Sequence, residues 1–74
     1  MKEGRGRILI TRSIDKKGLQ LSTVERILNH LHSISRKYGG DAADKRAEEL
    51  IGIIEDPANT EADILLALQR MEKQ

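Results

Sequence analysis

Two histidines, His30 and His32, are the residues of this 74-residue chain best suited to acid–base or metal chemistry near neutral pH. They stand two apart in a segment with helical periodicity, so their side chains point about 160° away from each other. No Asp, Glu or His stands three or four residues from either histidine, so no second ligand or proton acceptor lies on its helix face. We therefore expect two surface histidines and no metal site.

The other residues that could do chemistry do not form a catalytic motif. The twelve Asp and Glu fall mostly at expected helix starts or on solvent-facing positions, where capping explains them. The chain has no cysteine, which excludes a disulfide and a thiolate ligand. It also lacks the Gly-Lys-Ser/Thr triplet of a phosphate-binding loop. The sequence predicts a protein that is not an enzyme and that needs no cofactor.

Charge is divided unevenly along the chain, and this division bears on function. Residues 1–20 carry six Lys and Arg against two acids, a balance of +4, whereas residues 21–74 carry seven against ten, a balance of −3. A basic N-terminal segment often contacts nucleic acid or an acidic partner. The expected helix after it has a polar face with no acid within it and Glu25 at its edge, and the donors of this face suit phosphate oxygens and base edges. We predict that DNA is bound by Arg5, Arg7, Arg12, Lys16, Lys17, Arg26, Asn29, Arg36 and Lys37.

The elements that must position these residues are mostly helical. The chain has no Phe and no Trp, so its core must come from nine Leu, nine Ile and a few smaller residues, a composition typical of a helical bundle. We expect a mostly α fold: a small three-helix domain over residues 7–74, preceded by a flexible basic arm over residues 1–6. The β-branched segment Arg-Ile-Leu-Ile-Thr-Arg over residues 7–12 predicts one short N-terminal β-strand. The three helices are expected near 23–38, 42–55 and 61–72.

Capping and helix-breaking residues predict where these helices begin and end. Ser22 and Glu25 have the spacing of a capping box at the start of the first helix. Gly39-Gly40 is expected to end that helix, and Asp41 to cap the second. Asp56-Pro57 is expected to stop the second helix, and Asn59 or Thr60 to cap the third.

A strand followed by two helices loosely resembles the ribbon-helix-helix repressors, in which two strands pair across a dimer and enter the major groove. The resemblance covers residues 7–56 in the order of their elements only. It implies that Arg7, Thr11 and Arg12 would be the strand's polar readers of DNA. The chain departs from that pattern because about nine residues separate the strand from Ser22, and because a third helix follows.

A second function remains open, that of a non-enzymatic protein-binding module such as an inhibitor, an adaptor or an antitoxin-like polypeptide. It would dock through the second and third helices, where Ile53 widens one apolar face and Leu66, beside Ala62, points away from the core stripe.

A lone strand and a small core without disulfides both need a partner, so we expect a homodimer. The chain has no apolar run long enough for a membrane span or a signal peptide, so we expect a cytoplasmic protein without membrane contact.

Overall fold

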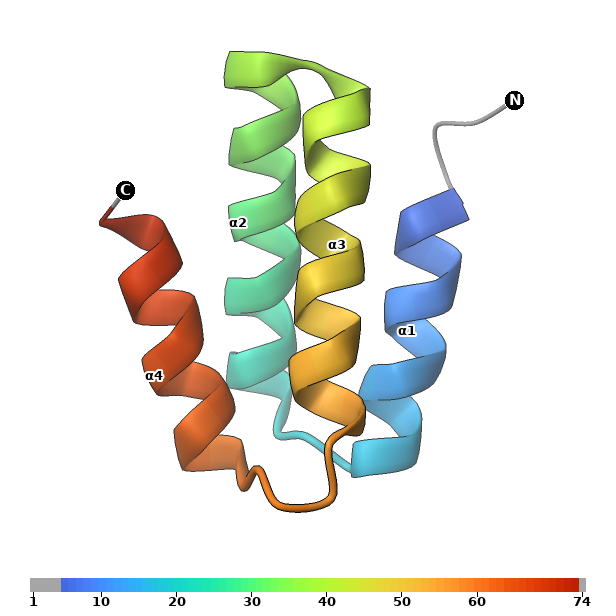
Figure 1. Ribbon diagram of the computed structural model, residues 1–74, viewed down its shortest axis with the longest axis vertical. Coiled ribbons are helices and arrows are strands. Elements are labelled where there is room, and N and C mark those ends of the chain that lie inside the picture. The colour runs from blue at the N-terminus through green and yellow to red at the C-terminus, as the bar shows by residue number, and fades with distance from the viewer. Residues whose placement is uncertain (1–4, 74) are drawn as a thin grey trace.

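Helices make up the regular structure of this protein. The computed structural model describes residues 5–73, and the side chains from Leu9 onward. The helices are α1 (Arg5–Lys17), α2 (Leu21–Tyr38), α3 (Gly40–Glu55) and α4 (Glu61–Glu72), and no strand occurs among the described residues. Successive helices run in opposite directions, with α2 and α3 in the middle of the molecule and α1 and α4 at its opposite edges (Figure 1).

The third helix holds the bundle together. Both α1 and α2 pack chiefly against α3, and α4 contacts α2 and α3. Each helix contributes aliphatic side chains to one buried cluster, and each fully buried side chain of this kind contributes about 1.5–3 kcal/mol. The cluster consists of Ile10, Ile14, Ile27, Leu31, Ala47, Leu50, Ile54, Ile64 and Leu68.

The three helices predicted from the sequence are confirmed, each to within two residues at either end. Gly39, at a φ of +97°, ends α2 in a conformation that a residue with a Cβ rarely adopts. Asp56 follows the last residue of α3, as expected from its place before a proline. Thr60 and Asp63 form a capping box at the start of α4, because the Thr60 side chain accepts from the Asp63 amide and the Asp63 side chain accepts from the Thr60 amide.

The N-terminal segment differs from the sequence-based expectation. The structure has the helix α1 from Arg5 to Lys17, where the sequence predicted a strand over 7–12, so the bundle has four helices in place of three. Ile10 and Ile14 lie one helical turn apart and are 0% and 4% exposed, since both pack into the common core. Of the predicted arm over 1–6, residues 1–4 lie outside the described residues, and the other two belong to α1.

The start of α2 is completed by α4 and not by a capping box of its own. The N-cap is Gln20, which makes no side-chain cap, and the predicted Ser22 lies already inside the helix and is exposed. The Glu61 carboxylate accepts hydrogen bonds from the Gln20 amide, at 3.1 Å, and from the hydroxyl of the buried Thr23. Glu61 is also the first residue of α4, so one negative charge lies at the positive ends of two helix dipoles.

Glu61→Ala is expected to lower the free energy of unfolding by about 1–2 kcal/mol, because it removes the acceptor of two hydrogen bonds at a helix start. Ser22→Ala is the matched control and should change it by less than about 0.5 kcal/mol, since Ser22 is exposed within α2. Urea unfolding followed by circular dichroism measures both. A larger loss for Ser22→Ala than for Glu61→Ala would contradict this account of the α2 start.

Candidate nucleic-acid interface

The exposed face of α2 carries polar and basic side chains. Ile27 and Leu31 belong to the apolar stripe of α2 and are buried in the core, so the residues on the opposite side of the helix face solvent. An open depression of about 400 Å³ lies on this exposed face. Its lining is Asn29, His32, Ser33, Arg36 and Lys37, without a carboxylate. Three of the nine predicted DNA-binding residues therefore lie together on one helix face.

Arg26 lies at the edge of this face and is already engaged. Its guanidinium forms an ion pair with the Glu72 carboxylate of α4, at 3.0 Å between Nη2 and Oε1. Both side chains are partly exposed, so this pair adds little to stability, but it neutralises Arg26 locally. A phosphate would have to compete with Glu72 for this arginine.

The basic residues of α1 form a separate group. Arg12 and Lys16 are exposed, whereas Lys17 is half-buried and donates from Nζ to the Asp56 carbonyl at 3.1 Å. Arg5 and Arg7 lie in α1 by their backbone, and their side chains fall outside the described part of the structure. The helix α1 packs on α3 at one edge of the bundle (Figure 1), and Arg12, Lys16 and Lys17 are not among the residues that line the depression on α2.

Two residues that the sequence did not connect, His30 and Arg46, meet between α2 and α3. His30 is only 8% exposed, which corrects the expectation of two surface histidines, whereas His32 is exposed as expected. Arg46 Nη1 lies 3.1 Å from His30 Nε2, and because a guanidinium only donates, Nε2 accepts and a neutral ring carries its proton on Nδ1. Burial lowers the pKa of His30, the Arg46 charge lowers it further, and Glu72 opposes them.

Arg46 extends the cationic surface beyond α2. A depression of about 440 Å³ shares Asn29, Ser33 and Lys37 with the one described above, and adds Arg46 from α3 and Glu72 from α4. The Arg46 side chain is 20% exposed, and its nearest carboxylate is that of Glu49, at 3.7 Å from Nε. Periodicity along α2 could not identify this arginine, because it lies sixteen residues away on another helix.

Of the three residues predicted for a protein interface, one is partly buried and two are exposed. Ile53 is partly buried and packs against the core, so it does not widen an outer face. Ala62 and Leu66 are exposed one turn apart on α4, and Leu66 keeps 49% of its surface accessible.

Within residues 5–73, no group of three or more His, Cys, Asp or Glu could hold a metal ion. No described helix is long and apolar enough to cross a membrane.

No protein-family model, no curated protein and no solved structure matches this chain. Its function must therefore be argued from its own residues and their arrangement.

The pKa of His30 should lie below its ordinary value of 6.5 in the folded protein, and Arg46→Gln should raise it by removing a nearby positive charge. The unfolded chain then binds a proton more readily than the folded chain as the pH falls through 6.5, so the free energy of unfolding decreases there. An NMR titration of the His30 ring measures the pKa, with Lys45→Gln as a control on the exposed side of α3. An unchanged pKa in Arg46→Gln would contradict the assigned contact.

Proposed function

We propose that this protein is a small DNA-binding regulatory or accessory protein that contacts the phosphate backbone through the exposed face of α2. The observation that carries the proposal is the open depression lined by Asn29, His32, Ser33, Arg36 and Lys37, in which every charged group is basic. Arg and Lys are the usual phosphate partners, and Asn can pair with an adenine edge.

The shape of this face suits a duplex better than a single strand. The eighteen residues of α2 span about 27 Å, and an α-helix fits the width of the major groove. Single-strand binding usually relies on several aromatic platforms, but the chain has one Phe, Tyr or Trp, Tyr38, which lines only the adjoining depression of about 440 Å³. Few cations are present, so binding should be modest in strength and sensitive to salt.

Arg36→Ala combined with Lys37→Ala should weaken binding to a random DNA duplex and reduce the salt dependence of log K by about two units, because each lost phosphate contact removes about one. Fluorescence anisotropy over a series of salt concentrations measures both quantities. The matched control is Lys45→Ala combined with Lys73→Ala, which removes the same charge from exposed positions off this face.

The control separates a local contact from a general effect of charge. Equal losses in the two double variants would show that binding follows net charge, and would reject the α2 face as the site. Absence of binding by the unaltered chain at low salt would reject DNA binding itself.

A protein-binding function is the second candidate, favoured by the exposed pair Ala62 and Leu66 on α4. An apolar side chain at the centre of a small interface contributes more when it is surrounded by residues that exclude water. Such a partner would pack an apolar helix face or a shallow pocket against Leu66.

Leu66→Glu should abolish the retention of any specific partner on the immobilised protein, whereas Gln69→Glu, which adds the same charge at a neighbouring exposed position, should retain it. Pull-down with quantitative mass spectrometry compares the two variants. Partners retained equally by both would show that Leu66 is an ordinary exposed residue.

A further inference from the structure

A second apolar stripe runs along α2, beside the one that packs on α3. A groove of about 340 Å³ lies between α1 and the first half of α2. Its apolar lining is Ile14, Leu19, Leu21, Val24 and Leu28. Leu21 is 73% exposed and Leu28 is 37% exposed, so the described helices leave this stripe incompletely covered.

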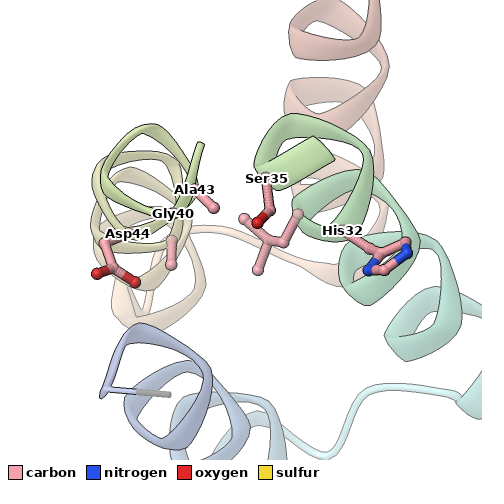
Figure 2. Close-up of a pocket in the computed structure, with 7 residues that line it drawn as sticks. His32, Ser35, Gly40, Ala43 and Asp44 are labelled. Carbon is pink, nitrogen blue, oxygen red and sulfur yellow. The ribbon is translucent and has the colours of Figure 1, made fainter. Parts of the chain in front are cut away.

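A hollow of about 230 Å³ lies at the other end of α2, where the helix meets the start of α3. Figure 2 shows Ser35 and His32 of α2 on one side of it, and Gly40, Ala43 and Asp44 of α3 on the other. Leu31 and Ala47 complete the lining. The hollow exists because α3 presents small residues here, which leave space that a larger side chain would fill.

The exposed leucine and the hollow belong to one side of α2. Leu21, Leu28 and Ser35 recur every seven residues, the spacing at which side chains share one seam of a helix pair. Leu21 and Ser35 are therefore about 21 Å apart along the helix, with Leu28 halfway between them. A protruding side chain and a hollow at equal distances from one residue are the arrangement that a two-fold axis requires.

We propose that a second copy of this chain docks on this surface, with the two α2 helices antiparallel and Leu21 of each copy inserted into the α2–α3 hollow of the other. The two-fold axis passes beside Leu28. The hollow has room for the side chain, since an aliphatic cavity of about 150 Å³ holds a benzene molecule. The contact is closed after two copies, so it produces a dimer and not a filament.

Charge favours the antiparallel orientation. On α2 the exposed acid Glu25 lies in the first half, and Arg36 and Lys37 lie in the last turn. An antiparallel pair brings Glu25 of each helix towards the basic end of the other, and opposes the two helix dipoles. A parallel pair would bring the two Arg36 side chains to the same end of the interface. The dimer proposal does not rest on DNA binding, although its surface adjoins the candidate DNA interface at His32, which lines both the hollow and the depression on α2.

Sedimentation velocity of the full chain over a concentration series tests the dimer. The unaltered protein should sediment as a dimer. Leu21→Ala, which removes the inserted side chain, and Ala43→Leu, which fills the hollow, should each raise the dissociation constant at least about tenfold. Leu9→Ala is the matched control, because Leu9 is 47% exposed on α1 but does not line the groove or the hollow. Circular dichroism establishes that each variant remains helical.

The absence of cysteine gives an independent test of the pairing. Leu28→Cys should form a disulfide-linked dimer on mild oxidation, because the two-fold axis brings Leu28 of one copy close to Leu28 of the other, whereas Leu9→Cys should form little covalently linked dimer, as judged by non-reducing gel electrophoresis. Two results would overturn the proposal: an unaltered chain that is monomeric at every concentration, or variants at positions 21 and 43 that dimerise as well as Leu9→Ala.

Discussion

The bundle depends on the width of the apolar face of α3. Ala47, Leu50 and Ile54 are buried along its centre, and Ile51 and Ile53 pack partly buried beside them. A helix with so broad a face can receive neighbours on more than one side, whereas a narrow stripe receives only one. Without disulfides and with a single aromatic residue, the other helices gain stability mainly by burying aliphatic side chains against this one. Because α2 turns its apolar stripe inward to α3, its polar face is left open to solvent.

The later part of the fold could be predicted from the sequence because local and tertiary signals agree there. Apolar periodicity gave the three helices, and Gly39, Asp56 and Thr60 marked boundaries that the structure confirms. In α1 the signals disagree, since β-branched residues favour a strand locally whereas Ile10 and Ile14 share a helix face. A helix satisfies its own backbone hydrogen bonds, so it needs no partner strand while its apolar face is buried.

The candidate interface also has one part that could be predicted from the sequence and another that could not. The exposed face of α2 followed from periodicity, because Asn29, Arg36 and Lys37 lie opposite the buried stripe. The contacts that modify this face join different helices, and no local pattern encodes them. Arg26 meets a carboxylate forty-six residues away, and Arg46 meets an imidazole sixteen residues away. The charge balance of residues 1–20 also overstates the number of cations open to a partner, since Lys17 donates to the backbone carbonyl of Asp56.

The contact between Glu61 and the start of α2 joins residues that are synthesised far apart in time. The ribosome makes α2 well before the carboxylate that completes its first turn, which comes forty-one residues after Gln20. Until α4 has docked, the first turn of α2 lacks its side-chain acceptor and is free to fray. The end of α2 that carries Leu21 therefore gains the acceptor of its first turn only when α4 is in place.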